Sequence, residues 1–231
     1  MKDNRLSGIA LILGAIASVA TMVFHPTHFN AIASGEAITH QVQVLLAVHA
    51  FALLTVPTVV FGFVVLTQCI GWERPGSLFA FIAYCLSAIA IMFAGIADGL
   101  INAALIQKML SADEATRGLL RAALEYNFQL NQACAKVFVF GTSLAIISWS
   151  IAIVRIRAFK RAIGVAGFFV GVAQLAVLLS GRVRLDVHGF GLIILLQAVW
   201  TVAVGVSMLQ TEPQPKAPVI VQVDERRATR C

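Results

Sequence analysis

The sequence predicts an all-α membrane protein in which six transmembrane helices form one polytopic bundle. Three observations lead to this fold class: 59% of the 231 residues are hydrophobic, only 12% are charged, and the mean hydropathy is +0.89. Soluble domains carry about 25% charged residues, so this chain lacks the polar surface to stay in water. Each crossing needs about 20 apolar residues, and the length accommodates six. We expect a transmembrane domain over 1–210 and a flexible cytoplasmic tail over 211–231.

Short polar breaks separate the first three apolar segments. Lys2 and Arg5 form a basic start to the first helix, which ends at Pro26 because proline cannot continue a helix. The second segment contains Pro57, which predicts a kink of the kind that membrane bundles tolerate. The predicted helices are 7–24, 41–70 and 77–100.

The third and fourth segments predict a helical hairpin longer than a membrane is thick. No proline interrupts the chain from 77 to 110 or from 111 to 155. Ser111 and Glu114 have the spacing of a capping box that would start the fourth helix. At 1.5 Å per residue, about 45 helical residues exceed the ~30 Å hydrocarbon core about twofold. We therefore expect helices 3 and 4 to project beyond the bilayer, with helix 4 entering it near Leu130.

The last two helices are predicted over 162–180 and 187–209. Gly167 and Gly171 have the G-x-x-x-G spacing that lets a neighbouring helix approach closely. Two interpretations stay open at this point. The glycines either pack against another helix of the same bundle or form the contact of a homo-oligomer.

The distribution of basic residues predicts the orientation. With six helices both termini share one side of the membrane, and eleven of the 17 Lys and Arg residues fall on that side. Five fall on the other side, and Lys136 lies within helix 4. Because basic loops stay in the cytoplasm, we expect both termini to be cytoplasmic. The same rule accounts for the net charge of +6, so the expected partner is the lipid bilayer and no nucleic acid.

This topology places all five histidines on the outer side and predicts a histidine cluster there. Ionisable groups at membrane depth normally face the bundle interior or a water-filled cavity. We therefore predict an outward-facing His/Asp/Lys pocket in which His49 faces Asp98 or His188 and Asp98 pairs with Lys136. The spacing of Glu125, Gln129, Gln132 and Lys136 puts them on one face of helix 4. The candidate ligand-binding residues are His49, Asp98, Asn102, Gln132, Lys136 and His188.

Three functions remain compatible with such a pocket. The first is binding or transport of a small solute or ion. The second is a membrane enzyme that depends on a divalent metal or haem, since imidazole and carboxylate ligate zinc and copper, and His49 with His188 would be the haem ligands. The third is an accessory protein that binds a partner through the hairpin 111–127. The candidate metal ligands are His25, His28, His49 and His188.

A glycine-rich first helix ends in His25-Pro26, and His188-Gly189 opens the sixth helix, which contains Trp200. In these features the chain resembles small six-helix bacterial inner-membrane proteins of unknown function. The resemblance implies the bacterial cytoplasmic membrane as the location. It implies no activity, cofactor or site residue.

Overall fold

The computed structural model describes residues 2–26, 35–156, 159–182 and 184–210, so the predicted tail lies outside the described residues. The secondary structure of this part of the chain is entirely helical, and six helices are long and apolar enough to cross a membrane. Both findings confirm the predicted helical class. The elements are α1 (Lys2–Phe24), α2 (Gly35–Ile70), α3 (Pro75–Gly95), the π-helix η1 (Ile96–Ile101), α4 (Asn102–Met109), α5 (Glu114–Ile156), α6 (Arg161–Ser180) and α7 (Val187–Gln210).

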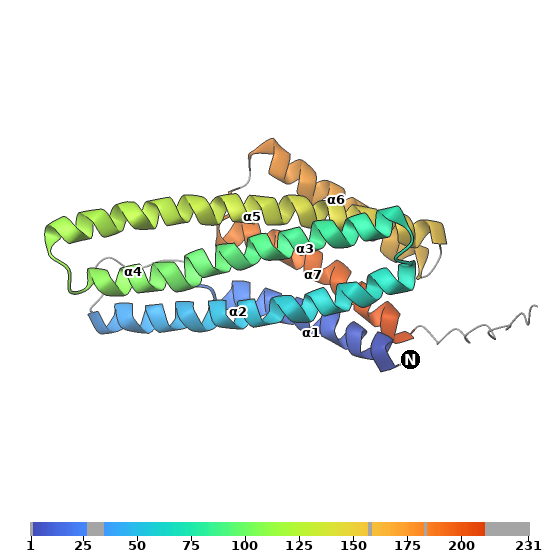
Figure 1. Cartoon of the computed structure of the whole chain (residues 1–231), viewed down its shortest axis with the longest axis horizontal. Helices are drawn as coiled ribbons and strands as arrows, with labels where there is room; N and C mark the ends of the chain where they lie inside the picture. The colour runs from blue at the N-terminus through green and yellow to red at the C-terminus, as the bar shows by residue number, and fades with distance from the viewer. Residues whose placement is uncertain (1, 27–34, 157–158, 183, 211–231) are drawn as a thin grey trace, which may run out of the picture.

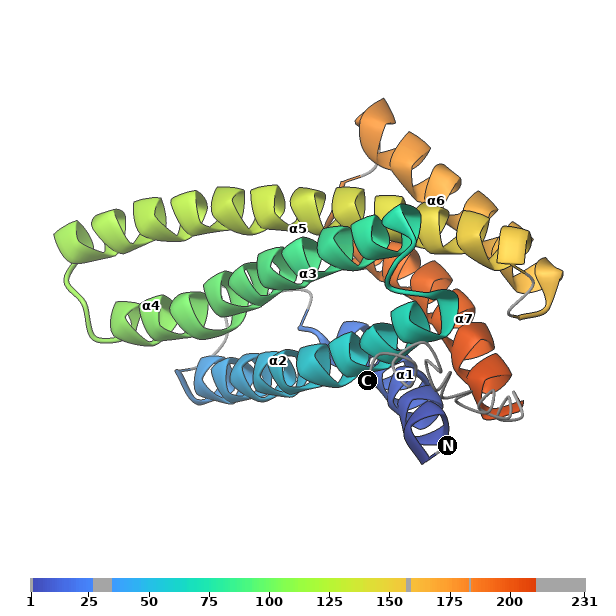
Figure 2. The same ribbon diagram turned by 45° about the vertical axis from the view of Figure 1, so that its right-hand side comes forward.

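The bundle combines three long and three short rods. At 1.5 Å per residue, the 36 residues of α2 span about 54 Å and the 43 residues of α5 span about 64 Å. The elements α3, η1 and α4 follow one another as a third long rod, whereas α1, α6 and α7 have only 20 to 24 residues each. The long rods therefore continue past the ends of the short ones (Figures 1 and 2).

The start of α5 differs from the prediction. The helix begins at Glu114, and the Thr116 N–H donates a hydrogen bond of 2.8 Å to Asp113 Oδ1. Asp113 is thus the N-cap in place of Ser111, because the residue directly before the helix already carries the required oxygen. The hydrogen bond from the Thr116 backbone holds the pKa of the Asp113 carboxyl below its usual value. From this cap α5 runs unbroken to Ile156, as the predicted hairpin requires.

The second helix also starts earlier than predicted, at Gly35 instead of residue 41. Glu36 lies in its first turn, where a carboxylate is favourable because the helix N-terminus carries partial positive charge. The N-terminal part of α2 lies alongside α4, and residues of both helices form a small buried core there. The exposed His40 lies on this extension.

An aromatic cluster forms the core near the opposite end of the long rods. Phe63 of α2 stacks on Trp149 of α5 with ring centroids 4.7 Å apart, and Tyr84 of α3 packs against both. The Trp149 indole N–H donates to Thr67 Oγ1 at 3.2 Å, which satisfies a polar group in a fully buried side chain. This cluster fixes α2, α3 and α5 relative to one another.

The glycines of α6 lie inside the bundle. A methyl group added to Gly167 would overlap Trp200 and Ser150, and one added to Gly171 would come within 2.9 Å of the Ser143 carbonyl oxygen. The close helix approach predicted from Gly167 and Gly171 therefore occurs within the chain, between α6 and α5. This arrangement is the internal alternative of the two that the sequence left open.

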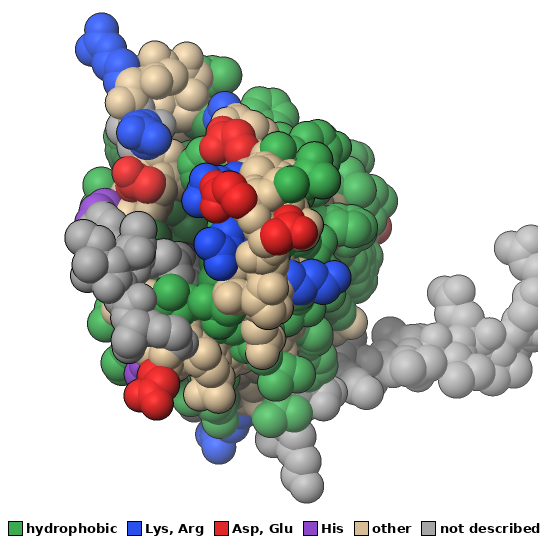
Figure 3. Space-filling view, turned by 90° about the vertical axis from the view of Figure 1, so that its left-hand side faces the viewer, with side chains coloured by type: hydrophobic (Ala, Val, Ile, Leu, Met, Phe, Trp, Pro, Cys, Tyr) green, Lys and Arg blue, Asp and Glu red, His purple; other side chains and the backbone are tan. Residues whose placement is uncertain are grey.

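Large apolar side chains cover the outside of the bundle. Leu54 of α2 and Phe169 and Leu179 of α6 are among the most exposed. An apolar surface this extensive is typical of proteins that contact lipid. By contrast, acidic and basic side chains gather at the hairpin end, around the turn between α4 and α5 (Figure 3).

Candidate functional site

A partly open cavity of about 970 Å³ runs along the inside of the bundle. Its lining residues on α5 extend from Arg117 to Ile146, a stretch about 43 Å long at 1.5 Å per residue. Phe63 and Tyr84 of the aromatic cluster lie at the far end from Arg117. Most of the lining is apolar, so the few polar groups in it are its distinguishing feature. The cavity is long and narrow.

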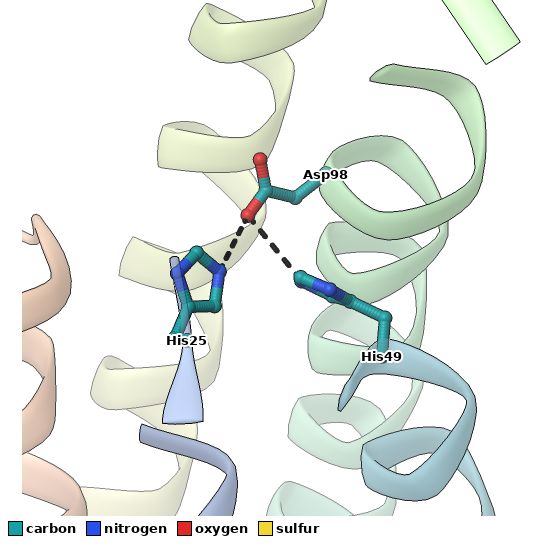
Figure 4. Close-up of side chains that lie close together, drawn as sticks. All are labelled: His25, His49 and Asp98. Atoms are coloured by element: carbon teal, nitrogen blue, oxygen red, sulfur yellow. Dashed lines mark hydrogen bonds and ion pairs between the residues drawn. The ribbon is translucent and has the colours of Figure 1, made fainter. Parts of the chain in front are cut away.

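Three ionisable side chains from three different elements meet in the wall of this cavity. His25 follows the last residue of α1, His49 lies on α2, and Asp98 lies on η1. Asp98 Oδ2 is 3.1 Å from His25 Nε2 and 3.3 Å from His49 Nε2. Figure 4 shows both rings directed at this one oxygen. We call these three residues the His–Asp cluster.

The second ring nitrogen of each histidine faces a backbone carbonyl. His25 Nδ1 is 3.0 Å from the Pro26 oxygen, and His49 Nδ1 is 2.9 Å from the Leu45 oxygen. A carbonyl can only accept a hydrogen bond, so each Nδ1 must carry the hydrogen. In the neutral imidazole the lone pair then belongs to Nε2. The Asp98 carboxylate is an acceptor as well, so each ring faces an acceptor on both sides. In a neutral ring Nε2 would meet the carboxylate with its lone pair, and in a protonated ring it would donate a hydrogen bond.

This arrangement requires positive charge between the three groups. Two imidazole lone pairs and a carboxylate oxygen are all electron-pair donors, and together they repel one another unless a cation lies among them. The side chains of His25 and His49 are only 11% and 7% exposed, so water screens this repulsion weakly. Protons on the imidazoles or a bound metal ion would each supply the charge. The geometry of the cluster fits either of these two sources of charge.

A chain of amide side chains fixes the Asp98 carboxylate. The Asn102 Nδ2 donates to Asp98 Oδ1 at 3.0 Å, and the Asn127 Nδ2 donates to Asn102 Oδ1 at 2.7 Å. Asn127 also donates to the Ala97 carbonyl oxygen at 2.6 Å. With Oδ1 held by Asn102, the carboxylate presents Oδ2 to the histidines. The π-helical turn directs Asp98 to this position, and such turns occur often at functional sites.

Gly99 makes room for His49. A methyl group on Gly99 would overlap Cβ and Cγ of His49, so the two helices meet closely at this point only because residue 99 lacks a side chain. The two histidine rings lie edge to face, with centroids 5.0 Å apart and an interplanar angle of 72°. Packing thus restricts His49 to the orientation that directs Nε2 toward Asp98.

A second polar group lies deeper in the cavity wall. The Gln197 Nε2 of α7 donates to Thr142 Oγ1 at 2.9 Å and to Gln174 Oε1 at 3.1 Å. Gln174 is fully buried and donates in turn to the Ile193 carbonyl oxygen. These contacts pair the two amide side chains within the bundle. Among the described residues, the acidic, basic and histidine side chains of the lining are those of the His–Asp cluster, Asp186, Arg117 and Arg121.

The structure brings together several of the residues predicted from the sequence. His49 faces Asp98 as expected, and Asn102 is hydrogen-bonded to Asp98. His25, a candidate metal ligand, completes the cluster. Gln132 lines the cavity and donates to the Leu185 carbonyl oxygen at 3.0 Å. His28 lies outside the described residues.

The predicted pair of Asp98 and Lys136 does not form. Within the described part of the chain, the ion-pair partners of Asp98 are His25 and His49. Lys136 is exposed, because it follows the buried Ala135 and each helical residue turns the side chain by about 100°. Glu125 and Gln129 are exposed as well, so the polar stripe predicted for helix 4 lies mainly on the outer face of α5. Lys136 is therefore not a pocket residue.

His188 is also outside the site. Its side chain is exposed, and it does not line the cavity. Asp186 accepts hydrogen bonds from the backbone N–H groups of Gly189 and His188, which keep the pKa of the Asp186 carboxyl below its usual value. His188 therefore belongs to the N-terminal cap of α7. The predicted haem ligation by His49 and His188 is wrong, because His49 lines the cavity and His188 does not.

Two site residues were not predicted: Asn127 and Asn131. Asn131 lines the cavity and donates to the Ala94 carbonyl oxygen at 3.1 Å. The two asparagines are four residues apart and therefore share one face of α5. That spacing was a usable signal, but the longer stripe of charged and amide residues on the neighbouring face obscured it.

Comparison with protein-family models, with curated proteins and with solved structures found no match to this chain. The resemblance to small six-helix inner-membrane proteins therefore stays an expectation. The functional argument depends on the cavity and the His–Asp cluster themselves.

The close packing at Gly99 leads to a testable prediction. Gly99→Ala should lower the free energy of unfolding by about 1–3 kcal/mol, the usual cost of overpacking, because the methyl group displaces His49. The measurement is the thermal unfolding midpoint of the purified protein in detergent. Gly118→Ala is the control, since nothing lies within 4 Å of a methyl group there and alanine favours the helix. Equal midpoints for Gly99→Ala and wild type would contradict the proposed packing.

Proposed function

We propose that this chain is a multi-pass protein of the bacterial cytoplasmic membrane that binds or transports a small, elongated, mostly apolar molecule with one polar group. The apolar part would occupy the cavity, and the polar group would contact the His–Asp cluster. The observation that carries the proposal is that the His–Asp cluster lies in the wall of a long, mostly apolar cavity. Binding sites of this kind are typically apolar pockets with a few convergent polar groups.

The proposed orientation has both termini in the cytoplasm and the hairpin outside. Basic residues in the turn between α2 and α3 and in the loop before α6, such as Arg74 and Lys160, support this orientation under the positive-inside rule. His25 and Asp98 would then lie near the outer membrane surface, where α1 ends. A solute could reach the cluster from outside or from the outer leaflet.

The charges at the hairpin end favour an anionic polar group. Arg117 and Arg121 line the cavity beyond the cluster, and each lies within 4 Å of Glu114. Glu114 is not among the lining residues, so these two guanidinium groups are the charges that this end of α5 presents to the cavity. Because the cluster itself requires positive charge, an amphiphile with a carboxylate or a similar anionic group suits both places.

A photoreactive alkyl carboxylate tests the cavity directly. We expect a diazirine-bearing long-chain carboxylate to label lining residues such as Leu53 in a saturable way, with excess unlabelled carboxylate suppressing the label. Leu54, which faces outward, should be labelled without saturation, because it contacts detergent or lipid. Mass spectrometry of peptides from the labelled protein would distinguish the two sites.

Two variants of α2 provide a matched pair for this experiment. Ala52→Phe fills the cavity and should abolish saturable labelling, because Ala52 lines it. Ala50→Phe places the same ring on the exposed face of the same helix and should leave labelling unchanged. Saturable labelling that survives Ala52→Phe, or is absent from the wild type, would contradict the proposal.

The orientation has its own test. In a background without the native cysteines, Ser111→Cys should react with a membrane-impermeant maleimide in intact cells, because the α4–α5 turn lies outside. Glu73→Cys, in the turn between α2 and α3, should react only after the membrane is permeabilised. Both positions are exposed, so accessibility in the folded protein is matched. The opposite labelling pattern would contradict the orientation.

A further inference from the structure

We propose that His25, His49 and Asp98 bind a divalent first-row transition-metal ion, with a further coordination position open to the cavity. The inference deepens the proposed function because it names the positive charge that would hold the anionic group. Only one part of the inference rests on the proposed function, namely that the anionic group of the solute occupies the open coordination position. The metal site itself follows from the geometry of the cluster.

The spacing of the ligand atoms suits such an ion. One ligand atom from each residue lies within 4.8 Å of the other two. Metal–nitrogen and metal–oxygen bonds of about 2.0–2.2 Å in a tetrahedral site imply ligand atoms about 3.3–3.6 Å apart. The observed separations of 3.1 and 3.3 Å between Asp98 Oδ2 and the two Nε2 atoms need only a small adjustment. The three donors thus already surround a point where an ion fits.

The tautomers of the histidines are those of metal ligands. A ligating imidazole needs a free lone pair on one nitrogen and usually donates the other N–H to a carbonyl or carboxylate. The Nδ1 atoms of His25 and His49 face backbone carbonyl oxygens, so in the neutral rings Nδ1 would donate to them and both Nε2 atoms would be free to ligate. Asn102 holds the non-ligating oxygen of Asp98 in the same supporting role. The cluster thus has the three ligand atoms and the hydrogen bonds that would hold them in place.

The composition of the site indicates the kind of metal. Two imidazoles and one carboxylate suit zinc, cobalt or ferrous iron better than calcium or magnesium, which prefer oxygen ligands. Three protein ligands leave a position for water or substrate, as in metal sites that bind or activate a molecule. The cluster lies in the cavity wall, so this position would be reached by the polar group of the bound solute.

Cobalt is the probe of choice because four-coordinate Co²⁺ absorbs visible light. We expect the chelator-treated protein, purified without a histidine tag, to bind one Co²⁺ with visible d–d bands that Zn²⁺ removes by displacement. Asp98→Asn and His49→Gln should abolish the bands, because each removes a ligand. Asn102→Ala should weaken binding by about 10–100-fold, the usual effect of removing a supporting hydrogen bond.

Exposed histidines supply the controls. His40→Gln and His188→Gln should bind Co²⁺ like the wild type, since both side chains lie away from the cluster. Because ligand variants can misfold, each would be accepted only if its thermal unfolding midpoint in the absence of metal matches that of the wild type. Asn102→Ala keeps all three ligands, so its graded loss would remain informative if the others misfold. Absence of a stoichiometric Co²⁺ complex, or one unaffected by Asp98→Asn or Asn102→Ala, would overturn the proposal.

The failure of this inference can be told apart from failure of the proposed function. Metal binding is measured without any alkyl carboxylate, and photolabelling is measured on metal-stripped as well as metal-loaded protein. Saturable labelling without any metal binding would leave the cavity function and overturn the metal site. Stoichiometric metal binding without saturable labelling would support the metal site and overturn the proposed cavity function.

Discussion

The repulsion between three electron-pair donors is the constraint on which the site depends. Two imidazole Nε2 atoms meet one carboxylate oxygen inside a largely apolar bundle, and the Nδ1 atoms of both rings face backbone carbonyls, so neutral rings would direct their lone pairs at the carboxylate. Such a contact is stable only with a cation among the donors. Several local features serve this contact: a π-helical turn that carries Asp98, a glycine that admits His49, and an amide chain that holds the free carboxylate oxygen.

The long helices extend past the His–Asp cluster and enclose the cavity around it. The short helix α1 ends beside the cluster, whereas α2, α4 and α5 continue beyond it. Their continuation encloses the outer part of the cavity and brings Arg117 and Arg121 to its end. The aromatic packing of Phe63, Tyr84 and Trp149 anchors the other end. A metal ion in the cluster would therefore lie between a polar outer entrance and an apolar interior, which is a suitable place to hold the head of an amphiphile.

Hydropathy was sufficient to predict the helical class and the number of apolar helices. In a membrane, a long apolar segment must satisfy its backbone hydrogen bonds internally, and a helix does so within the segment. Hydropathy was insufficient to predict which side chains of α5 point into the bundle. The stripe through Glu125 and Lys136 was assigned to the interior, yet the most polar face of α5 lies outward and neutral asparagines face the site. A helix that extends past the bundle exposes its charges, so polarity alone does not identify its inner face.

Contacts between distant segments were harder still to predict. His25 and Asp98 are 73 positions apart, and their meeting depends on the π-helical turn, for which the sequence 96–101 offers no recognised signal. His188 shared the predicted side of the membrane with His49, but the cap formed by Asp186 accounts for its position. Predicting the site from residues on the same side of the membrane therefore identified the correct region, but it also included residues that do not belong to the site.

The most direct test of the cation site is X-ray absorption at the metal edge of the zinc-loaded protein. The account predicts nitrogen and oxygen neighbours at about 2.0–2.2 Å, with outer-shell scattering from two imidazole rings and no sulfur in the first shell. Sulfur neighbours near 2.3 Å would show that cysteines bind the metal. That result, or scattering from oxygen alone without imidazole, would contradict the site formed by His25, His49 and Asp98.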